Sequence, residues 1–201
     1  MDIEQDFRPL AFYKLESSIN YFRPRQDLPD RVRITDPAVD VMTDLSRVST
    51  MMVTLTTPLN QALELMIKGG VRMLLVTEAD GKVDGLITSR DIHGDKVQTI
   101  LKKTGGTQKD LLVGDIMTLK NKMQVLKMVE VLPAKVGDMI ASLKAVDRQH
   151  AVVVDTDPYT GELAVRGIFS LAQIARQLGI NVDASLAAVT FDRIEEAIRG
   201  L

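Results

Sequence analysis

The sequence predicts an α/β fold in which two copies of a β-α-β-β-α unit pack as a pseudo-symmetric pair, preceded by an N-terminal extension. Three observations support this prediction: segments of the first half recur in the second, each copy alternates strand and helix patterns, and the spacing between the copies changes only in loops. The repeat matters most, because a repeated unit buries its apolar face against its neighbour.

The repeat is visible as three matched segments whose offset grows along the chain. Residues 40–43 recur as 115–118, residues 72–78 recur as 149–155, and residues 85–88 recur as 167–170. The step to the last offset falls in residues 156–162, a stretch with Pro and Gly in which a hairpin tolerates an insertion. Offsets that change only in loops indicate a true duplication.

Each copy has the pattern strand, helix, strand, strand, helix. In the first copy we expect strands at 52–55, 74–76 and 83–87, a helix over 59–68 and a second helix from about Thr88. In the second copy we expect strands at 129–132, 151–154 and 163–169, and helices over 136–145 and 171–178. The predicted organisation is an extension (1–33), a first repeat (34–104), a second repeat (105–180) and a tail (181–201) with a short amphipathic helix.

Composition restricts the function. Lys and Arg number 25 against 27 Asp and Glu, so no broad positive field is present to hold a nucleic acid. The chain has no Cys, which excludes disulfides and thiolate metal sites and fits a reducing compartment. No signal-peptide pattern and no apolar run of about 20 residues is found, so we expect a cytoplasmic protein without a membrane segment.

The N-terminal extension holds five of the eight aromatic residues of the chain, namely Phe7, Phe12, Tyr13, Tyr21 and Phe22. Such a segment can dock on its own repeats, cover a partner subunit or stay undocked. We expect it to dock on a protein surface, because exposed aromatic area is unfavourable in water.

Residues 70–91, which end in Gly85-Leu86-Ile87-Thr88-Ser89-Arg90-Asp91, resemble the second half of a cystathionine-β-synthase (CBS) motif. Residues 167–173 resemble the same part of a second copy, and the likeness covers roughly residues 36–180. The resemblance implies a stand-alone tandem CBS protein, a CBS pair or Bateman module, whose two units leave clefts for AMP, ADP, ATP or S-adenosylmethionine. It implies a regulatory module that changes the behaviour of a partner, without catalysis and without a required cofactor.

In ligand-binding members of that family, the pattern of Gly85, Thr88 and Asp91 places a hydroxyl near phosphate and a carboxylate on the ribose hydroxyls. A helix N-terminus also attracts anions, which agrees with a phosphate near Thr88. The same Thr-x-x-Asp spacing is a helix capping box that needs no ligand, so both interpretations stay open.

The second repeat departs from the pattern, because Gln173 follows Ser170 where the first repeat has Asp91, and an amide loses the charge-assisted bonds of a carboxylate. The family resemblance further implies base contacts from Val53, Thr54, Met73 and Leu74, for which core packing is the alternative. Arg90 and His150 are candidates for phosphate contacts. His150 can instead cap a strand edge.

Two functions remain in competition: a sensor of an adenine nucleotide or related adenosyl ligand, and a ligand-free dimerisation or scaffold module. No metal site is expected, because the chain has two His residues without ligand spacing. No nucleotide-binding or nucleophile motif of an enzyme is present. We expect a homodimer formed through residues 92–101 and 171–178, and an unidentified regulated protein as partner.

Overall fold

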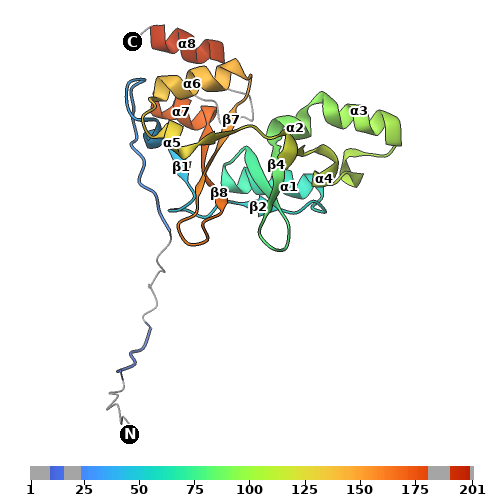
Figure 1. The fold of residues 1–201 in the computed structure, drawn as a ribbon. Helices are drawn as coiled ribbons and strands as arrows, with labels where there is room; N and C mark the ends of the chain where they lie inside the picture. Colours follow the sequence, from blue (N-terminus) through green and yellow to red (C-terminus); the bar gives the residue numbers. More distant parts are fainter. Residues whose placement is uncertain (1–9, 16–23, 181–190, 200–201) are drawn as a thin grey trace.

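The structure is a computed structural model that describes residues 10–15, 24–180 and 191–199 (Figure 1). Two four-stranded sheets form its centre, with strand orders β2-β3-β4-β5 and β1-β8-β7-β6. The first sheet comprises β2 (Met52–Val53), β3 (Met73–Thr77), β4 (Val83–Thr88) and β5 (Thr118–Leu119). The second comprises β1 (Met42–Asp44), β6 (Val125–Lys127), β7 (His150–Thr156) and β8 (Leu163–Ser170). The predicted α/β fold of two paired units is confirmed.

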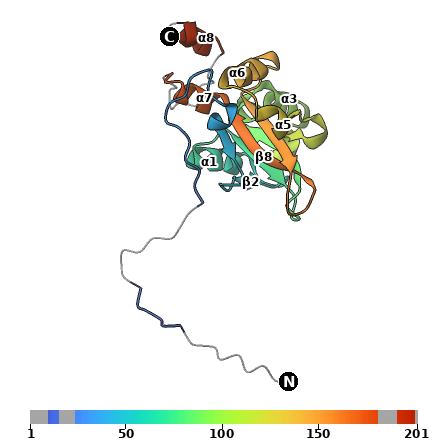
Figure 2. The same ribbon diagram turned by 60° about the vertical axis from the view of Figure 1, so that its left-hand side comes forward.

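Helices cover the outer face of each sheet. The first sheet is associated with α1 (Leu59–Gly69), α2 (Ser89–His93), α3 (Asp95–Thr104), η2 (Gln108–Asp110) and α4 (Val113–Ile116). The second is associated with η1 (Ala38–Val41), α5 (Met128–Val131), α6 (Val136–Ala145), α7 (Leu171–Gln177) and α8 (Phe191–Arg199), while η3 (Lys120–Lys122) links β5 to β6. Figure 2 shows the orange β8 in front of the green strands of the first sheet.

The two halves of the chain exchange their short leading strands. β1 lies at the start of the first repeat but pairs antiparallel with β8 of the second, with Met42 opposite Phe169. β5 lies near the start of the second repeat but pairs antiparallel with β4 of the first, with Gly85 opposite Leu119. Each sheet is therefore completed by a strand from the other half of the chain. The division of the two repeats between residues 104 and 105 stays a prediction.

Three apolar clusters separate the layers. Strand β3 is buried at every position, because its alternate side chains face opposite layers. Leu74 and Val76 belong to the cluster under the helices of the first repeat, whereas Met73 and Leu75 meet Val152 of the second sheet. This cluster between the sheets joins the two repeats into one structural unit.

Two predicted elements differ from the structure. Residues 129–132 form most of helix α5, and the strand lies earlier, at β6. The Lys127 N–H donates to Glu130 Oε2 at 3.4 Å, and Met128 and Val131, three positions apart, are both buried, as a helical turn requires. The helix expected to run on through residues 92–101 is divided at Gly94 into α2 and α3.

Part of the N-terminal extension is docked on the second repeat. The Val32 N–H donates to the Gln177 carbonyl at 2.9 Å, and the Gln177 side chain donates to the Pro29 carbonyl at 2.7 Å. Phe12 and Tyr13, in the described residues 10–15, are 100% and 90% exposed. The remaining aromatic residues of the extension, Phe7, Tyr21 and Phe22, lie outside the described residues.

The tail returns to the second repeat through helix α8, which was predicted. Ile194 is fully buried in the apolar cluster of that repeat, and Glu195 forms an ion pair with Lys144 of α6. Leu171 and Ile174 of α7 are also fully buried inside the chain, so they are not an open face for a second copy. The homodimer stays a prediction.

Candidate functional site

A cleft of about 180 Å³ lies between the two repeats. Its walls are the β4–α2 junction of the first repeat, the leading strand β5, the segment before β6 and the start of β7. The lining residues are Leu86, Thr88, Ser89, Arg90, Asp91, Thr118, Met123, Gln124, Asp147, Arg148, Gln149, His150 and Val152. Four residues singled out in the sequence, Thr88, Arg90, Asp91 and His150, are therefore brought together.

Thr88 and Asp91 form a closed capping box at the start of α2. Asp91 Oδ2 accepts from the Thr88 N–H at 2.8 Å and from the Thr88 hydroxyl at 2.6 Å, while the Asp91 N–H donates to Thr88 Oγ1 at 3.2 Å. These bonds satisfy backbone groups at the helix end and use only one carboxylate oxygen. The capping interpretation is thus realised, and it leaves Asp91 Oδ1 outside the box.

The same two bonds to a carboxylate occur a second time, away from the cleft, although there the Asp110 N–H donates to the Thr107 carbonyl at 3.0 Å. Asp110 Oδ2 accepts from the Thr107 N–H at 2.8 Å and from the Thr107 hydroxyl at 2.9 Å. Neither residue lines the cleft. A Thr-x-x-Asp sequence therefore does not identify a ligand site by itself; what distinguishes Thr88 and Asp91 is the wall contributed by the other repeat.

His150 projects from the start of β7, opposite Ser170 of β8. Burial lowers the pKa of its imidazole to about 4, and the positive charge of Arg72 acts in the same direction. At neutral pH the ring is therefore uncharged. It can serve the cleft as a neutral hydrogen-bonding group but does not supply a cation for a phosphate.

Five residues of the first repeat that were predicted to contact a ligand do not line the cleft, and neither do Ser170 and Gln173 of the second. Gly85 allows β5 to approach β4, because a Cβ at this position would lie 2.1 Å from the Thr118 carbonyl oxygen. Val53 and Leu74 are buried in the helix-side core and Met73 in the layer between the sheets. Thr54 is exposed, and its N–H donates to the hydroxyl of Thr57 at 3.0 Å.

The corresponding junction of the second repeat has a different arrangement. Ser170 makes no side-chain capping bond at the start of α7. Gln173 donates to Gln177 Oε1 at 2.9 Å and accepts from Arg176 at 2.9 Å. Gln177 in turn donates to the Pro29 carbonyl at 2.7 Å. Gln173, which stands where the first repeat has Asp91, is therefore connected to the docked extension.

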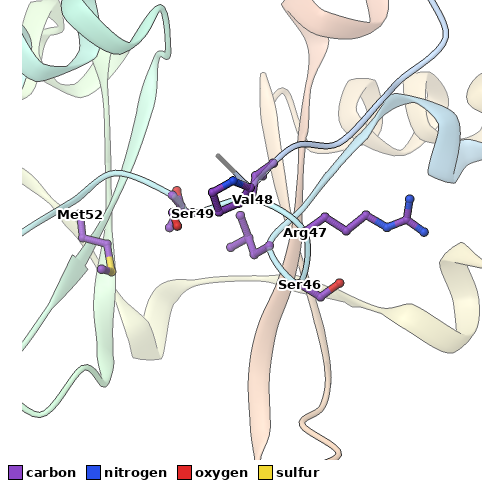
Figure 3. A pocket seen from close by; sticks show the side chains of 8 residues that line it. Ser46, Arg47, Val48, Ser49 and Met52 are labelled. Carbon is purple, nitrogen blue, oxygen red and sulfur yellow. The ribbon is translucent and has the colours of Figure 1, made fainter. Parts of the chain in front are cut away.

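A second, more open hollow of about 360 Å³ borders the crossover between β1 and β2 (Figure 3). Its lining residues are Pro24, Leu45, Ser46, Arg47, Val48, Ser49, Thr50 and Met52, none of which was predicted as a site residue. Figure 3 shows Met52 beside the first sheet and Arg47 extended away from it. Arg47 lies 3.8 Å from Asp44, so its charge has a partner.

Sequence reasoning missed the part of the cleft that comes from the second repeat. Asp147, Arg148 and Gln149 precede β7, and Met123 and Gln124 precede β6. The available signal was the family resemblance, which had singled out His150, because the neighbours of His150 in the sequence share that wall. In the described ranges, no group of three or more His, Cys, Asp or Glu residues is placed to hold a metal ion. None of the helices described there combines the length and apolarity needed to cross a membrane.

Residues 38–94 match the family model of the CBS domain. The first repeat of the chain therefore contains a CBS domain. This match includes β1 to α2 and therefore the capping box of Thr88 and Asp91. The second half repeats this architecture, and together the two units have the fold of a CBS pair. A comparison with curated proteins found no match.

Solved structures resemble the CBS pair over most of its length. An uncharacterized conserved protein from Pyrococcus horikoshii aligns with a TM-score of 0.51 and 20% identity, covering 79% of this chain and 98% of that protein. CBSX2 in complex with AMP aligns with a TM-score of 0.47 and 24% identity, over 70% of this chain and 94% of that one. A putative signal-transduction protein with CBS domains from Burkholderia ambifaria aligns with a TM-score of 0.49 and 21% identity, covering 70% of this chain and 88% of that one. The first of these alignments supports the fold.

Proposed function

We propose that this CBS pair is a regulatory module that binds an adenine nucleotide or a related adenosyl ligand in the cleft between its repeats, and thereby modulates a partner protein. The observation that carries the proposal is the convergence of both repeats on one cleft. Thr88 and Asp91 come from the first repeat, and Arg148 and His150 come from the second. A ligand held there touches both units, so its binding energy can change how they pack.

The chemistry of the cleft suits a nucleotide. Asp91 Oδ1 lies outside the capping box and can accept the hydroxyl groups of a ribose in charge-assisted bonds. Arg90 and Arg148 provide positive charge for phosphate. Leu86, Met123 and Val152 provide apolar surface, which suits a purine ring.

A thermal-shift screen with adenosine, AMP, ADP, ATP and S-adenosylmethionine tests the proposal. A ligand present at 100 times its dissociation constant stabilises the folded chain by about 2.7 kcal/mol. We expect a shift with at least one nucleotide, followed by saturable binding in calorimetry. Absence of binding by all five ligands at millimolar concentration would contradict the proposal.

The two capping boxes provide a matched pair of variants. Asp91→Asn and Asp110→Asn change the same two bonds from a Thr N–H and hydroxyl to a carboxylate, but only Asp91 lines the cleft. We expect both variants to lose similar stability and only Asp91→Asn to lose affinity, by about tenfold, since bonds to a charged group are the stronger ones. Equal affinity losses would show that capping, not contact, governs binding.

A ligand-free scaffold is the second candidate function. The closed box of Thr88 and Asp91 favours it, as do Met73 and Leu74, which pack in the core. In either case we propose a homodimer and a regulated partner in the cytoplasm, with no catalytic step. Light scattering is expected to give roughly twice the chain mass, and a monomer at micromolar concentration would contradict the dimer.

A further inference from the structure

An ion pair bridges the two repeats at the rim of the cleft. Arg90 Nη2 lies 3.2 Å from Asp147 Oδ2, and Arg90 Nη1 donates to the Asp147 carbonyl at 3.3 Å. Arg90 belongs to α2 of the first repeat, and Asp147 lies between α6 and β7 of the second. Both residues line the cleft, so this contact joins the walls that a ligand has to separate or pass.

The conformation of Asp147 is unusual for its residue type. Its φ angle is +47°, and no other non-Gly residue in the described ranges has a positive φ. The matching position in the first repeat is Gly70, with φ +62°, which adopts this region without steric cost. Asp147 therefore occupies a backbone conformation that suits glycine better, and its side chain contacts Arg90.

The positions that correspond to Arg90 and Asp147 when the two repeats are interchanged do not form such a pair. Gly70 has no side chain, and Ala172 stands where the first repeat has Arg90. The bridge is consequently confined to the cleft that contains Thr88 and Asp91. Both partners are well exposed, with side-chain exposures of 63% and 78%, so the pair is weak and can exchange partners.

We propose that Arg90 and Asp147 form a clasp on this cleft, which an anionic ligand opens by taking Arg90 from Asp147. The part of the proposal that concerns ligands rests on the proposed function. Asp147 then acts in two ways: it occupies the cation that a phosphate needs, and its carboxylate repels that phosphate. The clasp selects against weakly charged or poorly fitting anions and couples ligand entry to the contact between repeats.

Asp147→Asn tests the clasp, because it removes the charge and keeps the shape. Asp80→Asn is the control, since Asp80 also forms an exposed ion pair, with Lys82, on the β3–β4 hairpin away from the cleft. Asp147→Gly supplies the residue of the first repeat and separates the effect of charge from that of backbone strain. The unmodified chain and the three variants are each titrated with AMP and with adenosine in a calorimeter. Hydrogen exchange of their backbone amides is measured without ligand.

We expect AMP to bind Asp147→Asn about two- to fivefold more tightly than the unmodified chain, with adenosine affinity unchanged. In the ligand-free protein, amides at the rim of the cleft are expected to exchange about two- to fivefold faster in Asp147→Asn and Asp147→Gly but not in Asp80→Asn. If the unmodified chain binds neither AMP nor adenosine, the proposed function fails, and the exchange result alone decides the clasp. Unchanged exchange in both Asp147 variants overturns the clasp, as does an equal gain for AMP and adenosine.

Discussion

Thr88 gives its single hydroxyl to the capping box, donating to Asp91 and accepting from the Asp91 N–H. Thr88→Ala removes the cap and is expected to cost about 1 kcal/mol of unfolding free energy, whereas Thr88→Ser keeps the oxygen and should cost little. Chemical denaturation measures both. If the hydroxyl also meets phosphate, Thr88→Ala weakens AMP binding more than adenosine binding, while equal losses would assign Thr88 to the cap alone.

His150 makes stability depend on pH in a defined window. Its pKa is about 4 in the folded chain against 6.5 ordinarily, so the unfolded state binds more protons between these values. The stability from keeping the ring neutral is fully present above pH 6.5 and is lost as the pH falls toward 4, in total about 1–3 kcal/mol. His150→Gln should flatten the unfolding free energy measured from pH 7 to 4.5. An unchanged slope would contradict the assigned burial.

Asp44 titrates outside that window and can be separated from His150. Hydrogen bonds from Arg166 at 2.8 and 2.9 Å hold the pKa of Asp44 well below its usual range. A carboxylate with a lowered pKa contributes stability above about pH 4 and loses it as the pH falls further. Asp44 and His150 therefore change the unfolding free energy in different pH ranges, His150 between about pH 6.5 and 4 and Asp44 below about pH 4.

At the scale of elements, the docked extension depends on one buried amide. Gln177 is 4% exposed; it donates to the Pro29 and Asp40 carbonyls at 2.7 and 2.9 Å and accepts from Gln173. It thereby connects both the extension, at Pro29, and η1, at Asp40, to α7. The stability of this attachment should depend on Gln177 far more than on Gln173, which is only half-buried.

We predict that Gln177→Ala costs about 1–3 kcal/mol of unfolding free energy, because two carbonyls lose their donor and a gap remains. Gln173→Ala removes a bond at the surface of the same network and should cost less than about 1 kcal/mol. Denaturation measures stability, and limited proteolysis near Arg31 measures release of the extension. Similar proteolysis of Gln177→Ala and the unmodified chain would contradict this role.

The elements differ in how far sequence could predict them. Helices α1 and α6 were found almost to the residue, because their apolar spacing and end signals are local. Strand β6 was misplaced, since the extra turn of α5 shifts the repeat by a few residues. In strand β3 every residue is buried, so the pattern could not tell Met73, which faces the other sheet, from Leu74, which faces the helices.

The candidate site shows the same limit. Thr88 and Asp91 could be found because their spacing is a local motif. The spacing of Thr107 and Asp110 is identical, yet these residues lie outside the cleft. Asp147 could not be found, because its role depends on Arg90, a residue 57 positions away in the chain. Contacts of this range follow from the packing of the repeats, not from a pattern within either.

At the scale of the whole molecule, exchanged strands join the repeats, and each strand is tied by an ion pair between halves. Arg166 of β8 holds Asp44 of β1, and in the other sheet Lys120, next to β5, holds Asp84 of β4 at 2.9 Å. The signs of the two pairs are reversed. Residues on both sides of the midpoint are thus required for either sheet, and unfolding should be a single cooperative transition.

A chain divided between residues 104 and 105 tests this interdependence. Each fragment made alone lacks one strand of its sheet and the partner face of Met73, Leu75 and Val152, so we expect it to aggregate or stay unfolded. The two fragments produced together should associate and regain the circular dichroism spectrum of the intact chain. A first fragment that folds by itself, seen as a cooperative thermal transition, would contradict the prediction.

The pairing of Met42 with Phe169 also sets the order of events on the ribosome. At about 5–20 residues per second, a separation of roughly 125 positions leaves β1 without its neighbour for on the order of 10 s after its own synthesis. During that interval the backbone edge of β1 has no partner and is available to other nascent chains. The contact is also non-local enough to place its closure late in folding.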